Sequence, residues 1–549
     1  MRHNIILSYC FLLTVLLSSC HSRKRADLVF YNGKVYTVDS SFTVAEAFAV
    51  SEGKIVATGT SHEVLDVFDA KEKIDLGGKS VYPGFIDAHC HFFGYASDLS
   101  KANLYGTQSF DEVIEKLIAF SKQNKFSWLL GRGWDQNDWP VKEFPTKEKL
   151  DSLFPNIPVY LMRVDGHAVL CNEAALNLAG ISSSTKISGG EIILKNGKLT
   201  GILIDNAVEL AKKKIPPFTK ELNSSQLLQA QKNCFEAGLT TVDDAGLGRD
   251  SIELIDELQK SGQLKMRVYA MVSANESDKK YFFEHGPIKA ERLNVRSFKM
   301  YADGALGSRG ACLLQPYSDQ PNHTGFLLHE KKFFDEMAGE ALQHGFQLCT
   351  HAIGDSANRV ILQVYASHLK GKNDKRWRIE HCQVVSKDDL KLFGEYDIIP
   401  SVQPTHATSD MYWAAERLGK ERVKTAYAYK DLAQHANGKI AFGTDFPVEY
   451  INPLFTFYAA VSRKDLKGFP ENGFQPENKT ERKDALRAMT ILAAYSNFEE
   501  KEKGSLEKGK FADFVILDHD ILQSDETDIP KTKVLSTYVN GEQVYKVAK

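Results

Sequence analysis

The hydrophobic positions near both ends of the chain follow a short, strand-like pattern. Brief apolar runs separated by turn residues are typical of a small β-sheet domain, and they occur at residues 27–38, 45–50, 54–57, 512–517 and 534–545. An Asn-Gly pair, which favours a tight turn between strands, stands in each group, at Asn32-Gly33 and Asn540-Gly541. We expect one sheet domain built from both ends, because two separate small sheets would each bury little core.

The long middle of the chain, residues 84–499, shows a different pattern. Amphipathic stretches with helical spacing, such as residues 110–122 and 225–238, separate short apolar runs. These candidate strands are residues 128–130, 159–162, 240–242, 268–272, 298–300, 347–349, 378–379 and 440–442. Alternation of strand and helix over such a length predicts an α/β fold, a (β/α)8 TIM-like barrel with insertions.

Composition narrows the classes of partner. The 549 residues include 68 basic and 71 acidic side chains, which nearly cancel, so charge offers no case for nucleic acid or an anionic membrane surface. We therefore expect a small-molecule substrate. The sequence leaves the oligomeric state open, with a homo-oligomer among the alternatives.

The N-terminus has the features of an export signal. Arg2 and His3 precede an apolar stretch at residues 5–17, which is too short to span a bilayer comfortably. Small residues then lead to Cys20, as in a bacterial lipobox. We expect a signal peptide at 1–19, a lipid anchor on Cys20 and a short tether at 20–25, which would hold the protein at a bacterial cell membrane facing the periplasm or exterior. The alternative is an ordinary secretory signal with an incidental cysteine.

The remaining cysteines are scattered singly. With no C-x-x-C pair, they argue against a disulfide scaffold and against a cysteine-rich zinc site. Cys90, Cys349 and Cys382 each lie within two residues of a histidine considered below. We interpret these three as small buried packing residues.

The apolar run Gly84 to His91 ends in two histidines, His89 and His91. Side chains alternate along a strand, so both imidazoles leave the same face and can converge on one metal ion. The alternative is a pair of ordinary core histidines with satisfied hydrogen bonds.

Four further ionisable residues follow or interrupt apolar runs, where barrel enzymes place their chemistry. They are Lys299, His351, His381 and Asp445. An unpaired lysine inside a strand is costly to bury, although a snorkelling surface lysine is the usual alternative. Each position alone is more often structural, but the repeated placement predicts one shared site.

Weaker candidates follow the same logic. His167 and His406 lie after apolar runs and could donate hydrogen bonds to a substrate or oxyanion, or be structural histidines. Asp303 follows the strand of Lys299, and Trp134 opens an aromatic, amide-rich loop that could line or cap a pocket or simply pack at the surface. We include all four as candidate substrate-binding residues.

The ordered set of H-x-H, strand lysine, two strand-end histidines and strand-end aspartate resembles the metal-dependent amidohydrolase superfamily. Finer segments are similar to its YtcJ-like branch, which includes N-substituted formamide deformylases. They are KMYADGALGSRGA, THAIGDSAN, RIEHCQ, SVQPTHATSD and AFGTDFPVE. The resemblance covers nearly the whole mature chain and implies a barrel at 84–499 with a β-sandwich composed of 26–83 and 500–549.

The resemblance also implies a binuclear metal centre. His89, His91 and Asp445 would hold one divalent ion and His351 and His381 the other, with carbamylated Lys299 as the bridge. Imidazole and carboxylate ligands suit zinc, with manganese or iron as alternatives.

The implied reaction is hydrolysis of a non-peptide C–N bond in an amide, formamide or cyclic amide by metal-activated hydroxide. Asp445 would act as general base and then as general acid. Two alternatives stay open: a hydrolase of esters or phosphoesters, and a catalytically inactive, lipid-anchored binding protein.

Overall fold

The computed structural model describes residues 23–123 and 126–548. The expected signal peptide and the anchor at Cys20 lie outside these residues and stay predictions. The expected tether reaches too far, because strand β1 (Lys24–Tyr31) already begins at Lys24 and pairs in parallel with β6 (Phe68–Asp75) through Lys24 and Arg25. Among the described helices, none combines the length and apolarity needed to cross a membrane.

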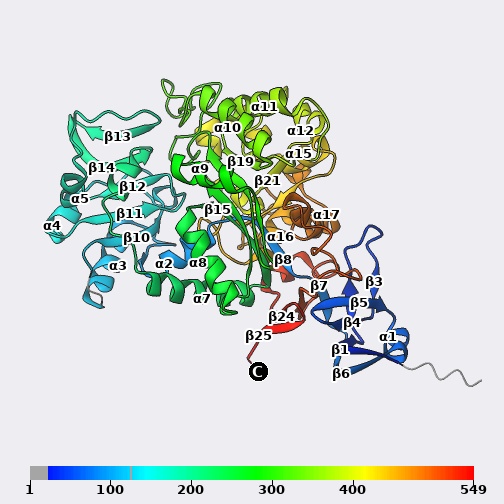
Figure 1. The fold of residues 1–549 in the computed structure, drawn as a ribbon. Helices are drawn as coiled ribbons and strands as arrows, with labels where there is room; N and C mark the ends of the chain where they lie inside the picture. Colours follow the sequence, from blue (N-terminus) through cyan, green and yellow to red (C-terminus); the bar gives the residue numbers. More distant parts are fainter. Residues whose placement is uncertain (1–22, 124–125, 549) are drawn as a thin grey trace, which may run out of the picture.

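Eight parallel strands form a nearly closed barrel at the centre of the molecule (Figure 1). In spatial order they are β8 (Phe85–Cys90), β15 (Leu239–Leu247), β16 (Arg267–Ser273), β18 (Leu293–Tyr301), β19 (Gln347–Ala352), β20 (Arg378–His381), β21 (Ile399–Val402) and β22 (Ala441–Phe442). Just beyond β22, the N–H of Asp445 donates to the carbonyl of His89 at 2.7 Å and brings the last strand to the first. The predicted α/β barrel is confirmed.

Helices cover the outside of the barrel, as its βα repeats require. They are α7 (Lys220–Glu236), α8 (Arg249–Lys260), α9 (Glu276–His285), α10 (Lys331–His344), α11 (Asp355–Leu369), α12 (Lys391–Glu395), α13 (Pro404–Asp410), α14 (Ala414–Arg422), α15 (Tyr429–His435), α16 (Pro453–Ser462), α17 (Arg482–Ala488) and α18 (Ile491–Ser496). The buried faces of these helices and the strands share one large hydrophobic core.

The two ends of the chain meet in two small sheets. One, ordered β5-β4-β1-β6, uses only N-terminal strands and the other, ordered β25-β24-β23-β7-β2-β3, mixes both ends. The further elements are β2 (Lys34–Tyr36), β3 (Val44–Ala45), β4 (Ala47–Ser51), β5 (Lys54–Gly59), α1 (Ser61–Val67), β7 (Ser80–Pro83), β23 (Phe514–Leu517), β24 (Val534–Val539) and β25 (Glu542–Lys546). Strand β7 continues directly into the first barrel strand, β8.

The two Asn-Gly pairs have different outcomes. Asn540-Gly541 closes a true hairpin, because β24 and β25 pair antiparallel and both turn residues have positive φ. Asn32-Gly33 also turns the chain, but β1 and β2 join different sheets. The same dipeptide therefore marks a turn in both places and a hairpin in only one.

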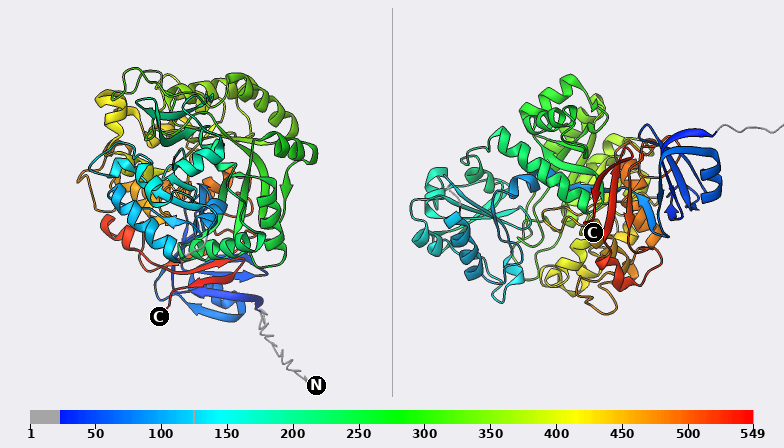
Figure 2. Two further views of the ribbon diagram at one scale, coloured as in Figure 1. Left: turned by 90° about the vertical axis from the view of Figure 1, so that its left-hand side faces the viewer. Right: turned by 90° about the horizontal axis from the view of Figure 1, so that it is seen from below.

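A separate lobe is inserted between β8 and β15. Its mixed sheet has the order β13-β14-β12-β11-β10-β9, and Figure 2 shows it on the side of the barrel away from the terminal sheets. The elements of the insertion are α2 (Phe92–Asp98), β9 (Ala102–Asn103), α3 (Phe110–Gln123), β10 (Leu129–Trp134), α4 (Glu148–Leu153), β11 (Val159–Arg163), β12 (Ala168–Cys171), α5 (Glu173–Ala179), β13 (Gly190–Lys195), β14 (Lys198–Asp205) and α6 (Val208–Lys212). The candidate strands at 128–130 and 159–162 thus belong to this lobe and not to the barrel.

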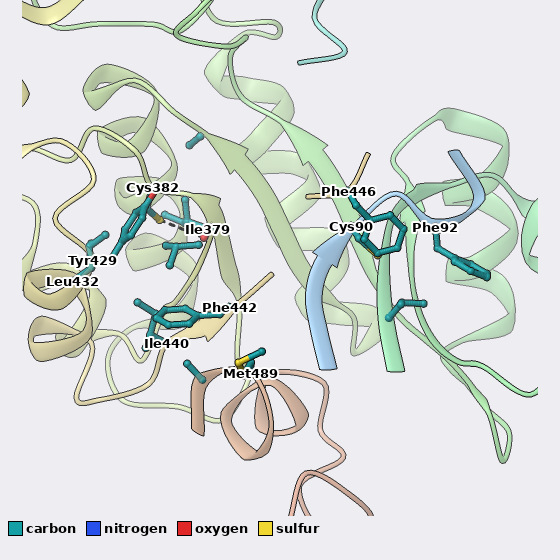
Figure 3. Close-up of a cluster of buried hydrophobic side chains, with 14 of the residues drawn as sticks. Cys90, Phe92, Ile379, Cys382, Tyr429, Leu432, Ile440, Phe442, Phe446 and Met489 are labelled. Atoms are coloured by element: carbon teal, nitrogen blue, oxygen red, sulfur yellow. Dashed lines mark hydrogen bonds between the residues drawn. The ribbon is translucent and has the colours of Figure 1, made fainter. Parts of the chain in front are cut away.

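The cysteines beside the candidate ligands are packing residues. Cys90 and Cys382 lie among buried aromatic and aliphatic side chains in Figure 3, and the Cys382 thiol donates to the carbonyl of Ile379 at 3.3 Å. Cys349 is equally buried, and all described cysteines are free.

Candidate metal centre

His89 and His91 leave the end of β8 toward the barrel axis. The Nδ1 of His89 lies 2.6 Å from Oε2 of Glu380, and the Nδ1 of His91 lies 2.9 Å from the carbonyl of Ala245. A hydrogen bond to an acceptor at Nδ1 fixes the proton there and leaves Nε2 with a free lone pair. Both Nε2 atoms approach Oδ1 of Asp445, at 3.7 Å from His89 and 3.3 Å from His91.

His381 and His351 complete the ring of imidazoles. His381 also carries its proton on Nδ1, which donates to Oε1 of Gln403 at 2.8 Å. Its ring centroid lies 4.7 Å from that of His89 and 4.5 Å from that of His351. In His351 the Nε2 faces the carbonyl of Gly304 at 3.4 Å, so Nδ1 is the nitrogen left for a ligand.

Asp445 lies where the imidazoles converge. One ligand atom from each of His89, His381 and Asp445 fits within 4.8 Å of the others, and all three side chains are buried. Asp445 has a left-handed backbone with φ of 61°, an uncommon conformation that is concentrated at functional sites. Burial raises its pKa, but the neighbouring imidazoles of His91, His89 and His381 outweigh burial and hold the pKa well below its usual range.

The donor set fits a divalent metal. Among the described residues, the buried Oδ1 of Asp445 accepts no hydrogen bond, which is costly unless a cation satisfies it. The imidazoles of His89, His91 and His381 surround Asp445, and Nζ of Lys299 lies 3.1 Å from Nε2 of His89. Imidazole plus carboxylate is a common ligand set for zinc.

Lys299 is buried in this site. It projects from β18 with only 1% of its surface exposed, and its Nζ lies 3.1 Å from Nε2 of His89. The snorkelling alternative is therefore wrong. Burial lowers the pKa of Lys299 to about 8, which increases the fraction of neutral amine at physiological pH.

A buried ionic network behind His89 holds its orientation. Arg378 donates to Oε1 of Glu380 at 2.8 Å and to Oδ2 of Asp243 at 2.9 Å. Burial raises the pKa of Glu380, but the charge of Arg378 and the contact with His89 outweigh it and lower the pKa to about 2. Glu380 and Arg378 were not among the residues predicted from the sequence, although two charged residues at spacing two in a buried strand were a usable signal.

His167 reaches the site from the inserted lobe. Its Nδ1 lies 2.6 Å from Oδ1 of Asp205, and its ring centroid is 4.9 Å from that of His351. Burial lowers the pKa of His167, but the Asp205 hydrogen bond and nearby carboxylates raise it above its ordinary value. His167 is therefore suited to donate a hydrogen bond.

His406, on α13, has the opposite proton arrangement to the other site histidines. The side-chain amide of Gln383 donates to its Nδ1 at 3.1 Å, so the proton lies on Nε2, which is 3.7 Å from Oδ2 of Asp445. His406 is a hydrogen-bond donor in this state and not a metal ligand.

Two candidate substrate-binding residues are placed elsewhere. Trp134 is 1% exposed, and its indole N–H donates to the carbonyl of Leu161 at 2.8 Å in the lobe core. The carboxylate of Asp303 accepts the backbone N–H groups of Ile353, Gly354 and Cys312 at 3.0, 2.8 and 2.8 Å. Neither side chain lines the cavity, because Trp134 packs inward and Asp303 anchors the loop after His351.

A cavity of about 460 Å³ opens onto the imidazoles at the carboxyl ends of the barrel strands. Its lining includes His91, His167, Lys299, His351, His381, His406 and Asp445. Barrel, lobe and site together define a metal-dependent hydrolase.

The comparisons identify the family. A model of the amidohydrolase family matches residues 72–545, and the chain belongs to that family. It is 31% identical to "Putative amidohydrolase YtcJ" of Bacillus subtilis, with 94% of this chain and 99% of that protein aligned. It is 27% identical to "N-substituted formamide deformylase" of Arthrobacter pascens, with 95% and 98% aligned. The structure of an uncharacterized metal-dependent hydrolase from Pyrococcus horikoshii has a TM-score of 0.74, 30% identity and coverage of 91% of this chain and 99% of that chain.

Proposed function

We propose that this protein hydrolyses a non-peptide C–N bond in a small amide, formamide or cyclic amide, using a binuclear metal centre. The observation that carries the proposal is the convergence of His89, His381 and Asp445, of which His381 and Asp445 line the cavity. The similarity to an N-substituted formamide deformylase favours formamides within this class.

The proposed ligands divide between two ions. His89, His91 and Asp445 would hold the first, His351 and His381 would hold the second, and Lys299, as a carbamate, would be a ligand shared by the two. Its neutral amine would add to carbon dioxide and lose a proton to solvent, giving a carbamate whose single negative charge is shared by two oxygens. The low pKa of Lys299, about 8, supports this step, because the neutral amine is the nucleophile. When bound, the ions lower the pKa of a water molecule and polarise the substrate carbonyl.

The side chains of this protein move the protons. Asp445, ionised at working pH, accepts a proton from the attacking water and later delivers it to the leaving nitrogen. The water oxygen forms a bond to the carbonyl carbon, the C–N bond breaks, and the products are a carboxylic acid and an amine. His406 donates from Nε2, and His167 donates when protonated, to the carbonyl oxygen as negative charge develops there.

A substrate panel tests this proposal. The metal-loaded protein is assayed with N-alkylformamides, N-acyl amines and cyclic amides, and with esters of matched shape. Release of formate or another acid from the C–N substrates is the expected result. Turnover of the esters without turnover of any C–N substrate would favour an ester hydrolase instead.

A further inference from the structure

We propose that the cavity selects substrates that carry a positively charged amine, held away from the metal ligands by Asp138, Asp410 and Glu449. This inference rests on the proposed function and adds a substrate class to it. The three carboxylates line the same cavity as the candidate ligands but belong to different parts of the chain.

Their positions are fixed by local contacts. Glu449 lies four residues after Asp445 and accepts a hydrogen bond from the Ser409 hydroxyl at 2.6 Å. The neighbouring Asp410 ends α13 and accepts from the hydroxyl of Tyr427 at 2.8 Å. Asp138 comes from the loop after β10, so the lobe and the barrel both contribute.

These carboxylates influence one another electrostatically. The pKa of Glu449 is raised to about 7, mainly by burial, with the charges of Asp445 and Asp138 contributing and the hydrogen bond from Ser409 opposing the shift. Burial also raises the pKa of Asp410, and the charge of Glu449 adds to that effect. The anionic forms are therefore disfavoured until a cation enters the cavity.

The cationic side chains that line the cavity form ion pairs or hydrogen bonds with other residues and not with this cluster. Arg163 is paired with Asp165, at 2.5 Å, and with Asp135. Lys299 is held beside His89. In the described part of the chain, none of Asp138, Asp410 and Glu449 has an ion-pair partner. A bound ligand would therefore supply the positive charge.

A buried amide adds a second, independent indication of a ligand. Gln383 is 4% exposed and lines the cavity, and its Oε1 has no hydrogen-bond partner among the described residues. The main-chain carbonyl of Gln383 accepts from Tyr427 N–H at 2.6 Å, and the Tyr427 hydroxyl donates to Asp410 at 2.8 Å, so Tyr427 connects the backbone at Gln383 with the cluster. These groups offer acceptors, and an alkylammonium offers three N–H donors together with the missing charge.

Three formamides of similar length test the inference. Monoformylputrescine carries a terminal ammonium, N-formylpentylamine has a methyl group in its place, and N-formyl-γ-aminobutyrate carries a carboxylate. The measured quantity is kcat/KM for formate release from each probe by the metal-loaded protein. The ratios of kcat/KM between probes are then compared in the wild type, Glu449→Gln and Asp138→Asn. Glu421→Gln, on the exposed surface, is the matched control.

We expect kcat/KM for monoformylputrescine to exceed that for the neutral probe by about tenfold or more, because hydrogen bonds between charged groups are strong. The anionic probe should have the lowest kcat/KM. The preference should shrink in Glu449→Gln and Asp138→Asn and at high salt, and persist in Glu421→Gln. Equal rates for the cationic and neutral probes, or a preference that survives both cavity substitutions, would overturn the subsite.

The two proposals fail in different ways. If the holoenzyme releases formate without charge preference, the subsite is wrong and the hydrolase stands. If it releases none from any probe, formamide hydrolysis is wrong, and calorimetric binding of the same probes decides the subsite. Tighter binding of the cationic probe, lost in Glu449→Gln, supports it, and equal binding contradicts it.

Discussion

Glu380 holds His89 from behind, with Oε2 of the carboxylate 2.6 Å from Nδ1 of the imidazole and both side chains fully buried. This contact directs Nε2 of His89 toward Asp445 and makes the ring a stronger ligand. Arg378 in turn fixes the carboxylate, so the orientation of a candidate ligand depends on a residue that touches neither substrate nor metal.

Glu380→Gln is expected to weaken metal binding by about 10- to 100-fold, because the neutral amide supports the imidazole less well than a carboxylate. Competition with a fluorescent chelator measures the affinity. Glu395→Gln, an exposed substitution on α12, is the control and should bind metal as the wild type does. Equal affinity in Glu380→Gln and the wild type would show that the contact does not support the site.

Asp445→Asn should lower kcat by about 100-fold or more, since the amide cannot accept the proton of the attacking water. Metal content, measured by mass spectrometry on the same sample, should fall less than activity because the imidazoles remain. An Asp445→Asn variant with full metal occupancy and unchanged kcat would contradict the proton-transfer role.

Gly304 leaves room for the carboxylate that supports His167. A Cβ at this position would lie 2.3 Å from Oδ2 of Asp205, so Gly304→Ala should displace the Asp205–His167 pair. We expect kcat to fall by about tenfold or more while the far-ultraviolet circular dichroism stays unchanged. Gly339→Ala, where the nearest atom is Cε1 of His368 at 3.6 Å, should be tolerated, and equal activity of the two variants would argue against the pair.

Asp244 should make stability fall as pH rises. It is 1% exposed, and burial raises its pKa to about 7 from its ordinary value of 3.8. The folded state therefore binds the proton more tightly than the unfolded state does. The contribution of protonated Asp244 to the free energy of unfolding is full below about pH 4 and is lost as pH rises through about 7. The largest effect is about 4 kcal/mol. The change in the urea unfolding midpoint between pH 5 and pH 8 should be smaller in Asp244→Asn than in the wild type. The same change in both proteins would show that Asp244 does not cause the pH dependence.

The sequence predicts the barrel and its candidate ligands because both depend on local pattern. Strand-end placement singles out His351, His381 and Asp445 without knowledge of the partners of each strand. The strands at 128–130 and 159–162 carry the same apolar pattern, and only long-range pairing assigns them to the lobe.

Side-chain direction is the part that sequence pattern does not determine. Trp134 and Asp303 follow strands as the site residues do, but one packs inside the lobe and the other binds three backbone N–H groups. Glu380 neighbours His381 in sequence yet supports His89, because side chains of the non-adjacent strands β20 and β8 meet inside the barrel.

The most direct test of the central claim follows hydrolysis and metal content in one titration. The protein is stripped with a chelator, and zinc is returned in steps while formate release from an N-alkylformamide is measured. If the centre is binuclear, activity disappears with the metal and returns to a plateau at two equivalents of zinc per chain. Undiminished hydrolysis by the metal-free protein would contradict it.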